Sequence, residues 1–381
     1  MGYSENIIPK YFSLMGYKVH VISSNLNIYG NTSDYDKNYK HFLGKAENKV
    51  GISKIGGFSL HRLPHKKFGN YILIKGLINK IRELSPDIIQ TISVNSLNTL
   101  LLATISSFYN FRLYTENHQH LSVVKPYLKY NKGYSIKRIV HKITRKFPIF
   151  ISSFFIKKCF AIAPDCFEVS NRIYGIPINK IVLSPLGTDT ALFKPAYSVK
   201  ELKDRSILRN NLGINDNIIL CIYTGRFSDQ KNPALLAKAI DDLSSEGMPY
   251  YGLFIGSGPQ EKQIINYKSS IVLPFMKHIE LVPYYQISDI GVWPNEESLS
   301  MLDAVSSGLP IIVNNMIGEK ERVLGNGYMY IKNDLNSLKE TLLKLLDRKK
   351  RQSFGLIGRK KMINTYSWDK IIHNRINDYK S

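Results

Sequence analysis

Short apolar segments alternate with helical segments along almost the whole chain, and this alternation limits the possible folds more than any other feature. The order is typical of parallel sheets whose strands are joined by helices. It predicts an α/β protein built from doubly wound sheets. The expected strands are residues 18–24, 58–63, 87–92, 112–115, 159–163 and 180–183 in the first half, and 218–224, 251–255, 288–293, 310–313 and 328–330 in the second.

The length of the chain predicts two domains, because 381 residues exceed what one hydrophobic core usually holds. The alternation of strands and helices stops over about residues 193–204, around Lys194-Pro195-Ala196, and then starts again. We expect a first Rossmann-like domain over 1–195 and a second over 196–365. An amphipathic helix anchored by Trp368 is expected in residues 366–381, packed back on the first domain.

The beginning of the chain differs from that of a complete doubly wound domain. Such a domain opens with a strand that leads through a glycine turn into a helix. Met1-Gly2-Tyr3 resembles the turn, and residues 5–15 are expected to form the helix. The first strand of the N-terminal domain is therefore expected to be missing. The alternatives are a true start further upstream, a shortened and impaired domain, and a fold that begins at Lys18.

The charge is unusual, since 52 Lys and Arg against 30 Asp and Glu give +22. This balance predicts an anionic partner. No acidic residue occurs over 117–164, and cations alternate with aromatic and aliphatic side chains over 125–158, which favours an anionic membrane surface. A solvated basic face and nucleic acid are the alternatives, and no nucleic-acid-binding motif supports the second.

Three observations bear on the compartment. No apolar run approaches the roughly 18 residues that span a bilayer. The N-terminus carries Glu5 and lacks the apolar core of a signal peptide. Cys159, Cys166 and Cys221 have no metal-ligand spacing, as expected of reduced thiols. The expected location is the cytoplasm, peripheral at the inner face of the cell membrane.

The strongest signal for chemistry is Gly225-Arg226-Phe227-Ser228-Asp229-Gln230-Lys231, which follows the strand at 218–224 and opens a helix. Such a junction presents backbone N–H groups and the positive end of a helix dipole, which suits a phosphate. Arg226 and Lys231 would add a planar fork and a point charge to the same pyrophosphate. The alternative is two surface cations beside a loop.

A second polar segment follows the strand at 288–293 and contains Glu297, Ser298, Ser300 and Asp303. The two acids stand at the ends of a short helical stretch, where carboxylates can hold sugar hydroxyls on either side of the phosphates. The alternative is that the acids at 296 and 297 stabilise a helix N-terminus through its dipole, while Asp303 is solvated.

Two segments of the first half also lie at strand ends. His118 and His120 follow the strand at 112–115, and doubly wound folds bind ligands at the carboxyl ends of strands. We expect His118 to hydrogen-bond a transferred sugar or to assist proton movement, with a purely structural histidine as the alternative. The turn residues of Pro185-Leu186-Gly187-Thr188-Asp189, together with Phe193, indicate an architectural role.

Together these segments resemble the group-1 glycosyltransferases (carbohydrate-enzyme family 4, GT-B fold) from Gly2 to the helix at Trp368. Gly225, Arg226 and Lys231 match the family's GRxxxxK turn. Residues 253–259 are similar to its GxGP loop, and 184–195 to its PNGVDxxxFxP segment, with Ser184 and Thr188 as departures. Where the family has two glutamates separated by seven residues, this chain has Asn295 and Asp303, with Glu296 and Glu297 nearby.

The resemblance implies two Rossmann-like domains facing across a cleft. It also implies retaining transfer of a sugar, by a hexosyltransferase-like enzyme, from a nucleotide diphosphate sugar, with no metal or other cofactor. The implied acceptor is lipid-linked or a saccharide, in cell-surface polysaccharide or lipopolysaccharide synthesis. The catalytic candidates are His118, Arg226, Lys231 and Glu297. The donor-binding candidates are Gly2, Gly225, Arg226, Lys231, Gly256, Glu297, Ser298, Ser300 and Asp303.

Two other functions fit the same pattern. A sugar-nucleotide epimerase on this fold would change its donor without an acceptor. A degenerate, non-catalytic relative would bind the nucleotide sugar without turnover, as the missing first strand and the altered acidic pair suggest.

Overall fold

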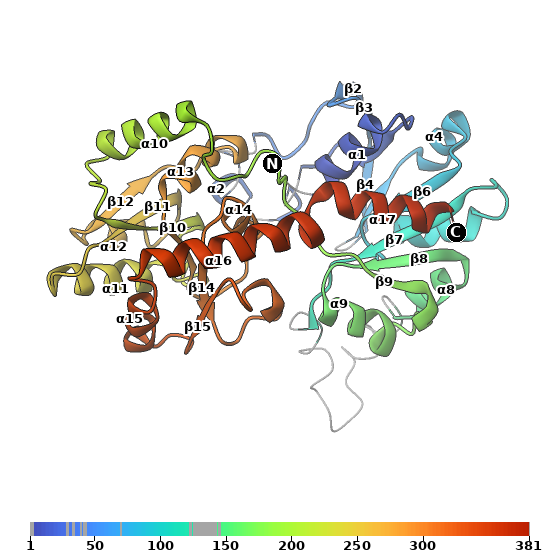
Figure 1. Cartoon of the computed structure of the whole chain (residues 1–381). Helices are drawn as coiled ribbons and strands as arrows, with labels where there is room; N and C mark the ends of the chain where they lie inside the picture. Colours follow the sequence, from blue (N-terminus) through green and yellow to red (C-terminus); the bar gives the residue numbers. More distant parts are fainter. Residues whose placement is uncertain are drawn as a thin grey trace. The chain divides into compact units, whose positions relative to one another are not determined.

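The computed structural model describes residues 4–380 except 28–29, 33–34, 39, 41–43, 69–70, 122–123, 125–142 and 144–145 (Figure 1). The chain divides into two compact units. The N-terminal unit holds the described residues up to Pro185 and those from Asn374 onward, and the C-terminal unit holds Leu186–His373. The division falls earlier than the expected boundary after residue 195.

The C-terminal unit is built on one parallel sheet of six strands in the order β12-β11-β10-β13-β14-β15. The central strands β10 and β11 are largely buried and apolar except at their carboxyl ends, as is usual for a parallel sheet that helices cover on both faces. The strands are β10 (Ile219–Arg226), β11 (Tyr250–Ser257), β12 (Ser270–Leu273), β13 (Ile290–Trp293), β14 (Ile311–Asn314) and β15 (Gly327–Tyr330).

The helices of this unit lie on both sides of its sheet, with α10 and α13 on one side and α11 and α15 on the other (Figure 1). A helix from Val199 occupies part of the segment where we expected a linker. The Ser198 hydroxyl accepts from the Glu201 N–H and the Glu201 carboxylate accepts from the Ser198 N–H, so a capping box starts this helix. The helices are α10 (Val199–Asn211), α11 (Pro233–Ser245), α12 (Glu261–Ile265), α13 (Val282–Ile287), α14 (Ser300–Ser306), α15 (Leu335–Leu343) and α16 (Arg348–Lys361).

The N-terminal unit contains two larger sheets and a hairpin, in the orders β1-β3-β2, β6-β7-β8-β9 and β4-β5. Strands β6 to β9 are parallel, as are β1 and β3, so the expected α/β class with parallel sheets is confirmed in both units. The strands are β1 (His20–Ser24), β2 (Gly51–Ile55), β3 (Phe58–Leu63), β4 (His65–Phe68), β5 (Tyr71–Ile74), β6 (Ile88–Thr91), β7 (Arg112–Asn117), β8 (Ile156–Ala161) and β9 (Ile181–Leu183).

The expected helix at residues 5–15 is present as α1, and no strand precedes it among the described residues. The helices of this unit are α1 (Ser4–Leu14), α2 (Tyr35–Asn38), α4 (Leu77–Leu84), α5 (Leu97–Ile105), α8 (Phe147–Phe155) and α9 (Pro164–Glu168). The last helix, α17 (Trp368–Lys380), begins in one unit and ends in the other. In the part of the chain that the structure describes, no helix has the length and apolar character needed to cross a membrane.

Helix α17 determines which face of β7 is covered in the N-terminal unit. Tyr114 lies against Tyr379, with ring centroids 4.6 Å apart, and Glu116 pairs with Arg375. The odd-numbered side chains of β7 point to the other face, where the Asn117 amide donates to the Cys166 carbonyl. The alternation of period two along a strand therefore gives α17 the even-numbered residues of β7.

Strands β1 and β6 each end a sheet, so one backbone edge of each has no strand beside it among the described residues. In β1, the alternation of ladder bonds turns the N–H groups of His20 and Ile22 away from β3. In β6, the Gln90 N–H is likewise turned away from β7. Every residue of both strands is half-buried, whereas five of the six residues of β7 are buried.

Hydrogen exchange should report these open edges in the chain of 381 residues. The amides of His20 and Ile22 should exchange at least about tenfold faster than that of Val21, because only the Val21 N–H is bonded to β3. Val21 is a matched control on the same strand, and mass spectrometry with fragmentation to single residues, or NMR, measures the rates. Equal protection at the three positions would mean that the edge of β1 is covered.

Candidate functional site

The carboxyl ends of β10 and β11 approach each other without side chains. Gly225 lies opposite Gly256 in the strand register, and a Cβ atom at Gly256 would collide with the Gly225 carbonyl oxygen. A Cβ atom at Gly258 would lie 2.6 Å from the Phe227 carbonyl oxygen. Glycine is therefore required for the backbone approach at both positions of the 256–258 turn. Gly225 and Gly256, two of the expected donor-binding residues, thus lie side by side at the carboxyl ends of β10 and β11, where neither carries a side chain.

Arg226 is the last residue of β10, and Lys231 lies in the turn that leads from β10 to α11. The Arg226 side chain is exposed, and the Tyr223 hydroxyl donates to the Arg226 carbonyl at 2.8 Å. The Lys231 ammonium donates to the Glu297 carbonyl at 3.3 Å and lies 3.8 Å from the Glu296 carboxylate. Burial lowers the pKa of Lys231; Glu296 opposes this change and the Arg226 charge adds to it. The turn thus holds two cations close enough to repel, and an anion between them would relieve that repulsion.

The loop after β13 is joined to the end of β10 by hydrogen bonds. The Ser300 hydroxyl donates to the Thr224 carbonyl at 3.2 Å and pairs with the Ser298 hydroxyl at 2.8 Å. The Trp293 indole N–H donates to the same Thr224 carbonyl at 3.2 Å. The expected residues Ser298 and Ser300 therefore lie beside the turn that carries Arg226.

The Glu297 carboxylate is bound by the loop that follows β14. One oxygen accepts from the N–H of Gly318 at 2.5 Å and from that of Glu319 at 3.2 Å, and the other accepts from Arg322 at 3.3 Å. The side chain thus anchors this loop, while its backbone carbonyl accepts from Lys231.

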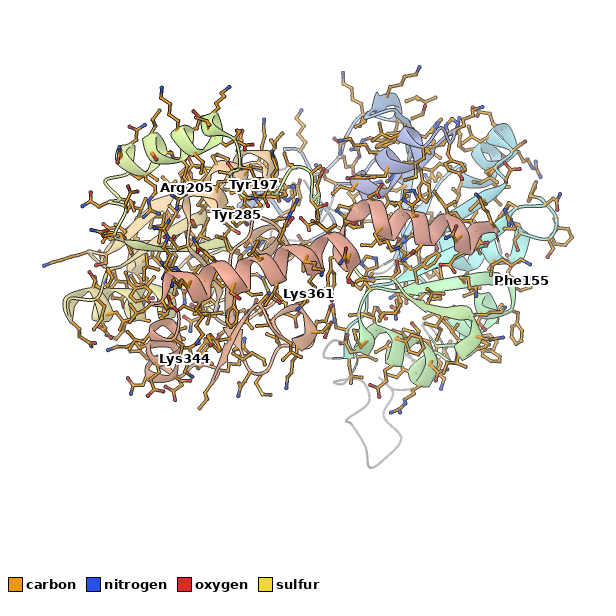
Figure 2. The ribbon with its side chains drawn as sticks, in the orientation of Figure 1. Phe155, Tyr197, Arg205, Tyr285, Lys344 and Lys361 are labelled. Atoms are coloured by element: carbon orange, nitrogen blue, oxygen red, sulfur yellow. The ribbon has the colours of Figure 1, made fainter. Side chains whose placement is uncertain are left out.

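Asp303 lies on α14 and is buried, in contrast to the solvated position considered as its alternative. One of its oxygens accepts from the Thr188 hydroxyl at 2.7 Å, and the other accepts from Nε2 of His278 at 2.8 Å. The His278 ring lies against Phe193, with centroids 4.6 Å apart. The Asp303 charge also adds to the burial that raises the pKa of Tyr285, which lies inside this unit (Figure 2).

Replacing Asp303 with alanine should lower the unfolding temperature measured by calorimetry. The Thr188 hydroxyl and the His278 ring lose their acceptor, and a buried polar group left without a partner costs about 1–3 kcal/mol. Asp242 is the control, because it pairs with Lys238 on the surface at 3.1 Å and such a pair contributes about 0–1 kcal/mol. Asp303→Ala and Asp242→Ala variants that unfold at the same temperature would contradict the structural role of Asp303.

His118 lies in the N-terminal unit, directly after β7. Its Nε2 atom is 2.6 Å from the Glu116 carboxylate. The neighbouring His120 pairs with Asp165 at 3.1 Å, and Asp165 also accepts from the Leu121 N–H. The ligand atoms of His120, Asp165 and Cys166 lie within 4.8 Å of one another, the one such group of potential metal ligands among the described residues.

The structure therefore gathers most of the expected donor residues in one unit. These are Gly225, Arg226, Lys231, Gly256, Glu297, Ser298, Ser300 and Asp303, whereas His118 belongs to the other unit and Gly2 lies outside the described residues. Sequence reasoning missed Thr188 as the partner of Asp303, although it had noted Thr188 as a departure from the family segment. It also missed His278, Arg322 and Arg375, for which no local pattern gives a signal.

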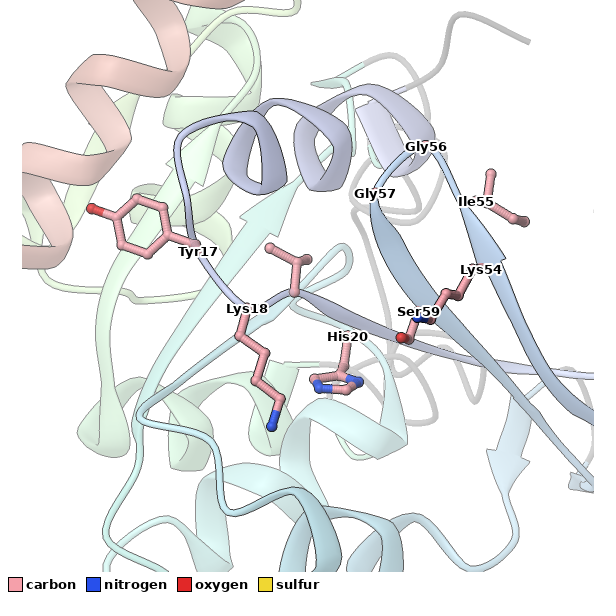
Figure 3. A pocket seen from close by; sticks show the side chains of 9 residues that line it. Tyr17, Lys18, His20, Lys54, Ile55, Gly56, Gly57 and Ser59 are labelled. Atoms are coloured by element: carbon pink, nitrogen blue, oxygen red, sulfur yellow. The ribbon is translucent and has the colours of Figure 1, made fainter.

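A pocket of about 430 Å³ opens elsewhere in the N-terminal unit (Figure 3). It lies at the amino end of β1, where Lys18, His20 and Ser59 line it. Burial, together with the Lys18 charge, lowers the pKa of His20, so this imidazole is neutral near pH 7. Doubly wound sheets bind ligands at the opposite, carboxyl end of their strands, so the pocket is separate from the candidate site.

Five curated relatives match parts of the chain, among them one from Bacillus subtilis and one from Acholeplasma laidlawii. Spore coat protein SA of Bacillus subtilis is 24% identical over 51% of this chain and 57% of its own length. Alpha-monoglucosyldiacylglycerol synthase of Acholeplasma laidlawii is 23% identical over 71% of this chain and 69% of its own length. The chain thus spans between half and about two thirds of the curated relatives it matches.

The fold extends the similarity to the whole chain. The crystal structure of Anabaena HepE in complex with UDP superimposes with a TM-score of 0.69 at 13% identity, covering 100% of this chain and 97% of that one. The family model described as glycosyl transferases group 1 matches residues 204–361, which carry the Arg226 turn, the Ser300 loop and Asp303. Residues 204–361 thus match the group 1 glycosyltransferases, and the whole chain has the GT-B fold of the similar solved structures.

Proposed function

We propose that the protein is a retaining glycosyltransferase, hexosyltransferase-like, that uses a nucleotide diphosphate sugar as donor. The observation that carries the proposal is the pair Arg226 and Lys231 in a turn between a strand end and a helix, beside the glycine edge of β11. The two cations and the positive end of the α11 helix dipole form a setting for a diphosphate. The similar HepE structure, which contains UDP, supports a uridine nucleotide.

In this proposal, Arg226 and Lys231 stabilise the negative charge that grows on the departing nucleoside diphosphate. The anomeric carbon passes through an oxocarbenium-like state, and the bond to the acceptor forms on the face that the diphosphate leaves. Asp303 holds ribose hydroxyls. Glu297, Ser298 and Ser300 contact the sugar, and His118 lies near its ring. No step draws on a metal ion.

Arg226→Ala and Lys231→Ala should each lower the transfer rate by at least about tenfold, since a hydrogen bond to a charged group contributes about 1.5–3 kcal/mol. Donor consumption and product formation are measured with UDP-sugars and a lipid-linked acceptor. Lys238→Ala is the matched control, because Lys238 lies on α11 and pairs with Asp242 on the surface. Wild-type rates in both variants would remove the pair from the mechanism.

The same assays separate the other candidate functions. A degenerate relative is favoured by the engagement of the Glu297 and Asp303 carboxylates inside the protein. It would bind UDP, measured by calorimetry, and turn over no donor. An epimerase would convert the donor when no acceptor is present.

We also propose that the acceptor is lipid-linked or a saccharide in cell-surface polysaccharide or lipopolysaccharide synthesis. The protein would work on the cytoplasmic side, at an anionic membrane surface. The relative named alpha-monoglucosyldiacylglycerol synthase supports a lipid acceptor. Much of the basic segment at 125–158 lies outside the described residues, and its described end is α8. Phe147 is 60% exposed and Phe154 65%, and Lys157 and Lys158 follow the helix.

The exposed aromatic side chains of α8 are typical of a helix that lies at a membrane interface. Exposed Phe150 packs edge-on against Phe154, and Phe155 ends the helix at the surface (Figure 2). Water-exposed aromatic side chains gain free energy by entering the headgroup region, and nearby lysines add attraction to anionic lipid.

The double variant Phe147→Ser/Phe154→Ser should bind vesicles of phosphatidylglycerol and phosphatidylcholine less than wild type in co-sedimentation. Binding of the wild type should fall as salt rises from about 0.1 to 1 M, because the Debye length, over which charges attract, falls from about 10 Å to about 3 Å. Phe108→Ser is the control, since Phe108 is 84% exposed and lies outside α8. Equal losses in the α8 and Phe108 variants would exclude α8 as the docking helix.

A further inference from the structure

A buried carboxylate lies directly behind His118. The Glu116 side chain is fully buried, and both of its oxygens accept hydrogen bonds. Oε1 accepts from the Gln90 amide at 2.6 Å and from the Arg375 guanidinium, and Oε2 accepts from Nε2 of His118 at 2.6 Å. The carboxylate therefore joins three side chains that come from β6, α17 and the end of β7.

The carboxylate remains ionised in this setting. Burial raises the pKa of Glu116, but the Arg375 charge and the hydrogen bond from His118 outweigh burial, so its pKa lies below the usual value. An ionised carboxylate only accepts hydrogen bonds, so the proton of a neutral His118 must be on Nε2. The Nδ1 atom then carries the lone pair, and it has no hydrogen-bond partner among the described residues. The His118 side chain is 30% exposed, and its Nε2 atom is the one that faces the buried carboxylate.

The C-terminal helix holds this arrangement in place. Arg375 is buried, donates from Nε to the Ser184 hydroxyl at 3.1 Å, and lies 4.7 Å from the centroid of the Phe160 ring. The Tyr379 hydroxyl, one helical turn further on, donates to the Gln90 amide oxygen. Two contacts from α17 thus converge on the carboxylate, one directly through Arg375 and one through Gln90.

We infer that Glu116 is the positioning residue of His118: supported by Arg375 and Gln90, it fixes the imidazole as the Nε2–H tautomer with Nδ1 toward the ligand. The role in sugar transfer rests on the function proposed above. Nδ1 then accepts a hydrogen bond from a hydroxyl of the sugar or the acceptor, and if the imidazole takes up that proton, Glu116 stabilises the resulting cation. Through its contacts with Glu116 and Gln90, helix α17 therefore helps to determine which nitrogen of His118 carries the proton.

The tautomer can be measured without activity. In protein labelled with 15N-histidine, long-range 1H–15N correlation spectra distinguish the two neutral tautomers, and His118→Gln identifies the signals of His118. Wild type should show Nε2–H alone. Glu116→Gln should shift the signals toward a mixture, because an amide can also donate, and Arg375→Lys, which retains a cation, should preserve the wild-type pattern.

A control separates positioning from loss of stability. Asp289 pairs with the buried Arg209 at 3.3 Å in the C-terminal unit, so Asp289→Asn weakens a similar buried ion pair away from His118. Its unfolding temperature should fall as in Glu116→Gln, while the His118 signals remain those of wild type. An unchanged tautomer in Glu116→Gln, or an equal change in Asp289→Asn, would overturn the inference.

The kinetics of sugar transfer test whether the positioning of His118 by Glu116 contributes to the reaction. Glu116→Gln should lower kcat at least about tenfold and change KM for the donor by less than about twofold, because the donor diphosphate is bound elsewhere. Turnover equal to wild type would overturn the role of Glu116 in transfer. If the wild type consumes no UDP-sugar, the proposed function fails, while the tautomer spectra still decide whether Glu116 positions His118.

Discussion

A buried carboxylate with no access to water must be neutralised inside the protein, and in the N-terminal unit the end of the chain does this for Glu116. Removing one partner of a buried ion pair typically costs about 3–5 kcal/mol, because the other charge stays buried. Without Arg375, Glu116 would therefore take up a proton, or the sheet would have to separate from α17 so that water could reach the carboxylate. The pair of Glu116 and Arg375 acts together with the Tyr114–Tyr379 contact to dock α17 on one face of β7, and Glu116 also accepts the hydrogen bond from His118.

The C-terminal unit uses a buried arginine in a comparable way, but at the opposite end of its strands. Arg209 donates to the carbonyls of Ile287 and Ile218, just before β13 and β10, and it pairs with Asp289. This network fixes the amino ends of the strands and leaves the carboxyl ends to glycines and hydroxyls, where Gly225 and Ser300 lie. Rigid support on one side allows the other side to carry an exposed Arg226 and the loops of the candidate site.

The sequence was sufficient for most of the architecture because parallel strands are apolar throughout and stand out between helices. The segment at 58–63 became β3, and 218–224 became most of β10. The expected strands did not include β2, β4, β5 and β12: β2 is exposed along its whole length, β4 is mostly basic, and β5 and β12 are short, with four residues each. Local motifs likewise located Arg226 and Lys231, whereas the partners of His118 and Asp303 could not be predicted. Arg375 meets Glu116 from 259 positions away, and Thr188 meets Asp303 from 115.

The departures from the family's acidic pair have different physical consequences in the proposed function. A carboxylate offers about four acceptor sites, so Asp303 can hold ribose hydroxyls while it retains Thr188 and His278. Asn295 is neutral, and its side-chain oxygen is buried without a hydrogen-bond partner among the described residues. A sugar hydroxyl could donate to that oxygen, but a neutral acceptor forms a hydrogen bond about half as strong as a charged one. In the proposed function, Asp303 would therefore still bind the nucleotide, Asn295 would bind the sugar more weakly than a glutamate, and the choice of sugar would depend more on the serines that accompany Glu297.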